Sequence, residues 1–152
     1  MRRQLNTNFN LIVMIDFNIT TYNSDKEYKG FQFYILNKGL NCGKPLENPC
    51  PNCFVCKLKN EEEREQFYWL LFGLWQGRAF YTSLLGSVIP YIRKNDLKDI
   101  IQNGIEKLNL NPEKVKKNIS AVAKIEEQRI TILKQLELIK QLKMALMFEV
   151  LK

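Results

Sequence analysis

The sequence has no histidine among its 152 residues. This excludes Ser-His-Asp and Cys-His catalysis, histidine-ligated metals and imidazole pH switches. It also lacks the G-x-x-x-x-G-K-[ST] and G-x-G-x-x-G motifs that cradle phosphates in many nucleotide-binding proteins. Asp16, Asp96 and Asp99 are scattered and have no metal-ligand spacing. The sequence therefore predicts a protein that is not an enzyme.

Long apolar runs are missing as well. Residues 11–15 and 67–75 are the most apolar stretches, and both are far shorter than the ~20 residues that a helix needs to cross a bilayer. Met1-Arg2-Arg3 is followed by polar residues, which a secretory signal would not place there. We expect a cytoplasmic protein without a membrane partner, in which the four cysteines are reduced or metal-bound.

Positive charge is in excess but is not concentrated. There are 23 Lys and Arg against 16 Asp and Glu, a formal charge of +7. Segments 1–60, 61–110 and 111–152 carry +4 (8 − 4), −1 (6 − 7) and +4 (9 − 5), with no run of five like charges. A nucleic-acid surface is one interpretation of this excess, and a solvated, solubilising surface is the other.

Segments rich in β-branched and aromatic residues predict strands in the first 60 residues. Residues 11–20 and 31–36 are two such segments, and residues 54–58 form a third, short one. Residues 42–51 contain three prolines and a glycine and are predicted to be irregular.

A helix is predicted from Asn60 to about Gln76. Asn60 is a favourable N-cap, the acids in residues 61–65 suit the positive first turn, and Gly77 is a natural stop. Helical spacing places a predicted buried face on this helix: Phe67, Leu70, Leu71, Leu74 and Trp75. Base stacking by the aromatic residues of this region is the alternative interpretation.

Two further helices follow. Asn95-Asp96 predicts the cap of a short helix that reaches about Gln102, and Asn111-Pro112-Glu113 predicts the start of a long one. No glycine or proline interrupts residues 113–152. Set in heptads, seven of nine seam positions are apolar, with Arg129 and Lys143 as exceptions. We expect a coiled-coil-like homodimer through these seven residues: Val122, Ile125, Ile132, Leu136, Ile139, Leu146 and Val150.

The four cysteines form the pattern C-x7-C-x2-C-x2-C, made by Cys42, Cys50, Cys53 and Cys56. Thiolates with two residues between them can chelate one zinc ion, and four would close a structural tetrahedral site. The alternative is free thiols in a turn and a strand, because all four cysteines crowd into 15 residues and Cys56 would lie on the strand face opposite Val55. We therefore predict no required cofactor, with structural zinc as the open alternative.

Two stretches resemble the half-units of specificity subunits of type I restriction–modification enzymes. The first is similar to part of their target recognition domain: residues 67–71 (FYWLL), 77–80 (GRAF), 86–90 (GSVIP) and 94–97 (KNDL). The second is similar to their spacer helix: residues 125–130 (IEEQRI) and 142–146 (LKMAL). The resemblance implies a mixed α/β core that reads DNA through loops, and spacer helices that form a coiled coil and dock methyltransferase subunits.

This chain departs from that pattern because residues 119–124 look helical where the proline-rich lead-in is expected. The cysteine loop has no counterpart in it. The sequence is also similar to a group of short uncharacterised proteins from gut Bacteroidales, through residues 37–40 (NKGL), 50–55 (CPNCFV) and 86–90 (GSVIP).

These features together predict an α+β fold: a small mixed sheet, a buried central helix and a long C-terminal helix. The predicted division is a core over residues 1–110 and the helix over residues 111–152. The predicted function is a DNA-binding module resembling half of a specificity subunit. The basic residues expected to contact the phosphates of duplex DNA are Lys38, Lys44, Arg78, Arg93, Lys94 and Lys98. The alternative is a protein-interaction or assembly module whose long helix binds a methyltransferase-type or other protein partner.

Overall fold

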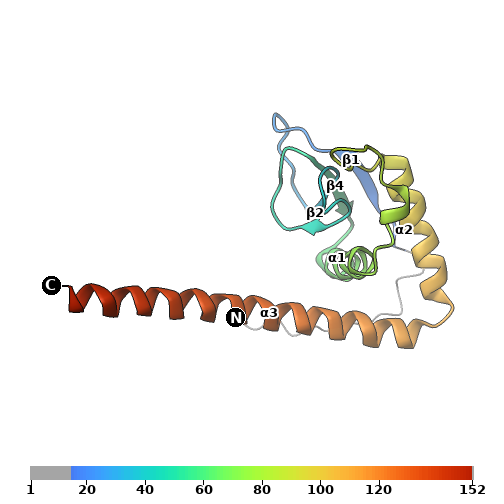
Figure 1. Ribbon diagram of the computed structural model, residues 1–152. Helices are drawn as coiled ribbons and strands as arrows, with labels where there is room; N and C mark the ends of the chain where they lie inside the picture. Colours follow the sequence, from blue (N-terminus) through green and yellow to red (C-terminus); the bar gives the residue numbers. More distant parts are fainter. Residues whose placement is uncertain (1–14, 152) are drawn as a thin grey trace. The chain divides into compact units, whose positions relative to one another are not determined.

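The structure, a computed structural model, describes residues 15–151 (Figure 1). The chain forms two compact units, Met1–Lys116 and Lys117–Lys152, each described below by itself. The elements, in chain order, are β1 (Asn18–Thr21), β2 (Phe31–Leu36), β3 (Pro45–Leu46), β4 (Cys53–Leu58), α1 (Glu61–Gln76), the 3-10 helix η2 (Tyr81–Ser83), α2 (Lys94–Asn109) and α3 (Pro112–Val150). Among the described residues, no helix is both long and apolar enough to span a membrane.

The α+β fold class is confirmed. Four strands form one sheet in the order β1-β4-β2-β3, and every neighbouring pair is antiparallel. The predicted mixed sheet, with both parallel and antiparallel pairs, is therefore wrong. Residues 37–44 connect the neighbouring strands β2 and β3, and parallel pairing needs a crossover of a dozen or more residues. This loop is too short for it, so β2 and β3 are antiparallel, and β4 lies between β1 and β2 and pairs antiparallel with both.

The first strand is shorter than predicted, because β1 begins only at Asn18. Of the predicted strand over residues 11–20, residues 11–14 lie outside the described part of the chain, and residues 15–17 precede β1. The irregular stretch over residues 42–51 contains the two-residue strand β3. Pro45 does not prevent β3 from pairing, because β3 is an edge strand and proline is tolerated at the edge of a sheet.

One face of the sheet packs on α1. Ile19, Cys56 and Phe33 lie side by side across three strands and are fully buried. The Phe33 ring contacts Phe67 and Tyr68 of α1, with ring centroids 6.2 and 5.4 Å apart. The predicted burial of α1 is thus observed at its first turns, where aromatic pairs add to the apolar area removed from water.

The opposite face of the sheet has a smaller cluster of its own. Tyr34 and Val55 are buried there with Cys53. Tyr22 covers them from the β1–β2 loop, edge-on to Tyr34 with ring centroids 5.7 Å apart, and Tyr28 stacks on Tyr22 at 5.5 Å. Because both faces are covered, β4 is buried at every position except Lys57.

Helix α1 begins and ends where predicted. The Asn60 side chain accepts a hydrogen bond from the Glu63 amide at 2.8 Å, which caps the first turn. Arg64 then joins the helix to the sheet: its Nε donates to the Gln32 carbonyl at 2.7 Å, and its guanidinium pairs with Glu47. Two residues of the predicted buried face, Leu74 and Trp75, are only partly buried.

Helix α2 reaches Asn109, beyond the predicted end at Gln102. The sequence favours an early end because Gly104 lowers helix propensity. In the structure Gly104 is buried, and a β-carbon there would lie 3.1 Å from both Leu74 methyl groups. The glycine is therefore the point at which α1 and α2 approach closely.

Helix α3 starts as predicted. The Asn111 side chain accepts a hydrogen bond from the Lys114 amide at 3.3 Å, and Pro112 is the first helical residue. The helix has 39 residues and no break (Figure 1). At 1.5 Å per residue it is about 58 Å long.

Candidate nucleic-acid interface

Two loops that lie far apart in the sequence are hydrogen-bonded to each other. The first, residues 37–44, connects β2 to β3, and the second, residues 77–93, connects α1 to α2. The Gly39 amide donates to the Pro90 carbonyl at 2.7 Å, and the Ile92 amide donates to the Asn37 carbonyl at 3.0 Å. We call these two loops, with Lys94 at the start of α2, the paired-loop surface.

The paired-loop surface is basic. Residues 37–46 and 77–95 contain no aspartate or glutamate. Of the six basic residues predicted to bind DNA, the structure places five on this surface: Lys38, Lys44, Arg78, Arg93 and Lys94. A surface with several cations and no carboxylate attracts polyanions, and its attraction falls with added salt.

Lys98 does not belong to this group. It lies on α2, partly buried, beside a shallow cleft that Asp16 and Asp99 also line. Its charge acts on the buried Cys56 thiol, where it opposes the effect of burial on the thiol pKa. Lys98 lies one helical turn beyond Lys94, and its partial burial and the action of its charge on Cys56 of β4 separate it from the paired-loop surface.

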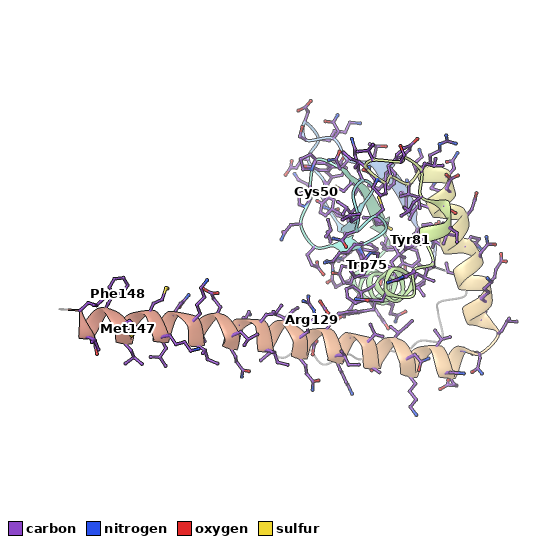
Figure 2. All side chains as sticks on the ribbon, in the orientation of Figure 1. Cys50, Trp75, Tyr81, Arg129, Met147 and Phe148 are labelled. Atoms are coloured by element: carbon purple, nitrogen blue, oxygen red, sulfur yellow. The ribbon has the colours of Figure 1, made fainter. Side chains whose placement is uncertain are left out.

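A cleft of about 300 Å³ opens between the two loops and the end of α1. Trp75 and Tyr81, both labelled in Figure 2, line it together with Arg78 and with the amide side chains of Asn41 and Gln76. The Lys44 ammonium lies over the Trp75 ring, 5.1 Å from its centroid. Aromatic, amide and guanidinium groups are the kinds of side chain that bind bases and phosphates.

Arg78 has an unusual backbone. It is the one described residue other than glycine with a positive φ, at 59°. The Ala79 amide donates to the Leu74 carbonyl and the Arg78 amide to the Trp75 carbonyl, both at 2.9 Å, which is the Schellman pattern of helix ends. The left-handed position of this motif usually holds glycine. Gly77, predicted to fill it, has φ −73° and comes one residue too early.

Gly43 of the first loop packs closely against the Phe80 ring of the second loop. Gly43 has φ +86°, and a β-carbon there would lie 2.3 Å from the Phe80 ring. Phe80 is buried, and it precedes η2, which carries Tyr81. The Gly43 amide donates to the Leu36 carbonyl at 2.8 Å. No short-range signal in the sequence reveals this contact, because its partners are far apart along the chain.

The cysteines do not gather at one point. The Cys42 thiol is directed at the Pro90 carbonyl at 3.5 Å, and the Cys53 thiol donates to the Cys50 carbonyl at 2.8 Å. Cys53 and Cys56 are three residues apart on β4 and so lie on opposite faces of the sheet. Among the described residues, no three Cys, Asp or Glu side chains are grouped in a way that would hold a metal ion.

The buried thiols predict a loss of stability at alkaline pH. Burial raises the pKa of Cys42 and of Cys53 to about 11, from an ordinary value of 9.0. Between these two values the unfolded chain loses the thiol protons while the folded chain keeps them, so unfolding is favoured as the pH rises. We expect the urea midpoint to fall between pH 9 and pH 11, and to fall less in a Cys42→Ala/Cys53→Ala variant. Equal decreases in both proteins would contradict this account.

The family model for DUF6943, a family of unknown function, matches residues 19–149. The chain belongs to this family. No curated protein and no solved structure matches the chain. The DUF6943 match begins within β1 and ends near the end of α3, so the paired-loop surface and the long helix both lie inside the family's span.

The predicted seam of α3 is open to solvent in this DUF6943 chain. The six predicted dimerisation residues beyond Val122 are each at least half exposed: Ile125, Ile132, Leu136, Ile139, Leu146 and Val150. Arg129, at a seam position, pairs with Glu126 at 2.6 Å. Figure 2 shows Arg129, Met147 and Phe148 along the helix.

The apolar surface of α3 is wider than the predicted seam. Further exposed apolar residues lie off the seam: Ile130, Leu133, Leu138, Leu142, Met144, Met147, Phe148 and Leu151. They are densest over residues 142–151, where the helix is apolar on most sides. A helix with apolar residues on most sides favours a partner that covers more than one stripe. The heptad pattern alone did not identify these residues.

Proposed function

We propose that this protein is a non-enzymatic, cytoplasmic DNA-binding module that dimerises through α3. The observation that supports the proposal is the paired-loop surface: hydrogen bonds join two distant loops that carry five cations and no carboxylate, and these loops line a cleft with aromatic, amide and guanidinium side chains. The similarity of residues 67–97 to target recognition domains, which read DNA through loops, supports the same conclusion. The four free thiols suit a reducing compartment.

In this proposal the cations contact phosphates and the polar loop residues contact base edges. Phosphate contacts supply most of the affinity but carry no sequence information, whereas side chains such as Asn41 and Gln76 can read the hydrogen-bonding pattern of bases. Dimerisation through the α3 seam would supply two copies of the paired-loop surface, and two copies bind duplex DNA more tightly than one.

The alternative function is a protein-interaction or assembly module. The observation that favours it is the exposed apolar surface of α3, which exceeds what a two-stranded seam covers. The partner would be a protein that covers residues 142–151, such as a methyltransferase-type subunit. In that case the α+β core is a scaffold, and duplex binding is absent.

Fluorescence anisotropy with a random 20–30 bp duplex pool at several salt concentrations separates the two functions. Five phosphate contacts predict a slope of log K against log salt of about −4.5. The matched control is Lys26→Gln, which removes an exposed lysine from the β1–β2 loop, outside the paired-loop surface. No binding at ~50 mM salt, where electrostatic attachment is strong, would exclude the DNA function.

The variant Arg78→Gly is expected to separate binding from stability. Glycine adopts the left-handed position at no steric cost, so the free energy of unfolding should rise by about 0.5–1 kcal/mol. The loss of one phosphate contact should at the same time weaken duplex binding and reduce the salt slope by about 0.9. Urea unfolding and the anisotropy titration measure the two effects. A variant that is more stable and binds as tightly as the natural protein would remove Arg78 from the interface.

A further inference from the structure

Three aliphatic side chains are exposed at the tips of the paired loops. Leu40 and Val88 are each 88% exposed, and the neighbouring Ile89 is 51% exposed. Single exposed apolar residues are common, but a cluster of them on a soluble domain indicates an interaction surface. We call these three residues the aliphatic tip.

Hydrogen bonds hold the aliphatic tip in place. Gly39, next to Leu40, donates to the carbonyl of Pro90, which follows Ile89. The second loop is a closed turn, because Leu85 and Tyr91 exchange two backbone hydrogen bonds of 2.8 Å. Gly86 has φ +90° in this turn, and a β-carbon there would lie 2.6 Å from the Ile89 carbonyl. The tip is therefore preorganised, so that binding does not have to order it.

The surroundings of the aliphatic tip indicate what it contacts. Lys38 is two residues before Leu40, Lys44 is four residues after it, and Arg93 is four residues after Ile89, with no carboxylate in either loop. Leu40 also lines the cleft that contains Arg78 and the amide of Asn41. Aliphatic groups surrounded by cations and amides match the stacked bases, phosphates and base edges of DNA.

We propose that the aliphatic tip inserts between adjacent base pairs of bound duplex DNA and kinks it. Apolar side chains such as Leu and Ile unstack a base step in this way and bend the duplex by roughly 20–90°. The cations of the same loops then contact the phosphates that the bend brings closer. This inference rests on the proposed DNA function and adds the mode of contact to it.

The test compares two variants of the whole chain on duplexes that carry a fluorescent donor and acceptor at opposite ends. Leu40→Gln/Val88→Thr/Ile89→Thr removes the aliphatic tip, and Leu110→Gln changes an equally exposed leucine, 86% exposed, outside both loops. The natural protein and Leu110→Gln should both shorten the end-to-end distance of the duplex. The tip variant should bind about tenfold to a hundredfold more weakly and leave the duplex straight. Its salt slope should be unchanged, because no charge is removed.

Each other outcome has a distinct meaning. If the natural protein binds no duplex, the proposed function fails and this inference fails with it. If the natural protein binds duplex DNA without bending it, and the tip variant binds equally well, the inference alone is overturned. Sedimentation with phosphatidylserine-containing vesicles is the third arm. The inference is overturned if the natural protein binds these vesicles at 150 mM salt, the tip variant does not, and neither bends DNA. The aliphatic tip would then be assigned to a lipid surface. Circular dichroism melting confirms that both variants are folded.

Discussion

Gly43→Ala is expected to lower the free energy of unfolding by about 3 kcal/mol, because two costs add at one position. The first is the left-handed backbone, which costs an L-residue about 1–2 kcal/mol. The second is the β-carbon, which would overlap the Phe80 ring and displace a buried aromatic side chain, at about 1–3 kcal/mol. Urea denaturation measures the total.

Gly39→Ala is the matched control for Gly43→Ala. Gly39 lies in the same loop with φ +101°, but a β-carbon there meets nothing within 4 Å. Gly39→Ala should therefore lose stability through the left-handed backbone alone, without a steric overlap. The difference in unfolding free energy between the two variants then measures the overlap with Phe80. Equal losses in both variants would show that the contact between Gly43 and Phe80 does not hold the paired loops closed.

Leu136→Glu/Ile139→Glu is expected to convert the proposed α3 dimer into a monomer. Two dimer partners would each lose two buried apolar side chains worth about 1.5 kcal/mol apiece, which raises the dissociation constant by about ten-thousandfold. Sedimentation velocity over a concentration series measures this change. The natural chain should sediment as a dimer at tens of micromolar, and a monomer there would contradict the prediction outright.

Leu138→Glu provides the control for the seam. Leu138 is as exposed as its neighbours but lies off the heptad seam. A two-stranded coiled coil leaves this position in solvent, so the variant should remain a dimer. If Leu138→Glu dissociates the protein as strongly as the seam variant, the assembly uses a wider face of α3 than the heptads define.

The sequence predicted those elements whose signals are local. Residues 31–36 alternate in the manner of a strand and form β2, Asn60 and its acids start α1, and Asn111-Pro112 start α3. Each of these signals depends on residues within one or two turns. The length of α2 was underestimated because packing of Leu74 against Gly104 outweighs the low helix propensity of glycine.

The candidate site was only partly predictable. Charge alone selected Lys38 and Arg93, but their joint position depends on backbone hydrogen bonds between residues about 50 positions apart, for which no periodicity exists. The left-handed conformation of Arg78 was missed because Gly77 beside it fits the usual helix end better. Lys98 was assigned to the site by sequence proximity, but it is partly buried on α2 and its charge acts on Cys56 of the sheet.

The strand order also has a consequence for synthesis of the protein. Within residues 15–151, β1 pairs with β4 alone, so Asn18–Thr21 stays without its hydrogen-bonding neighbour until residues 53–58 have been made. Such long-range pairing closes a large loop and is intrinsically slow to form. β2, β3 and β4 follow one another closely and can assemble first, with β3 and β4 pairing on either side of β2. β1, which is synthesised before the other three strands of this sheet, is therefore expected to join it last.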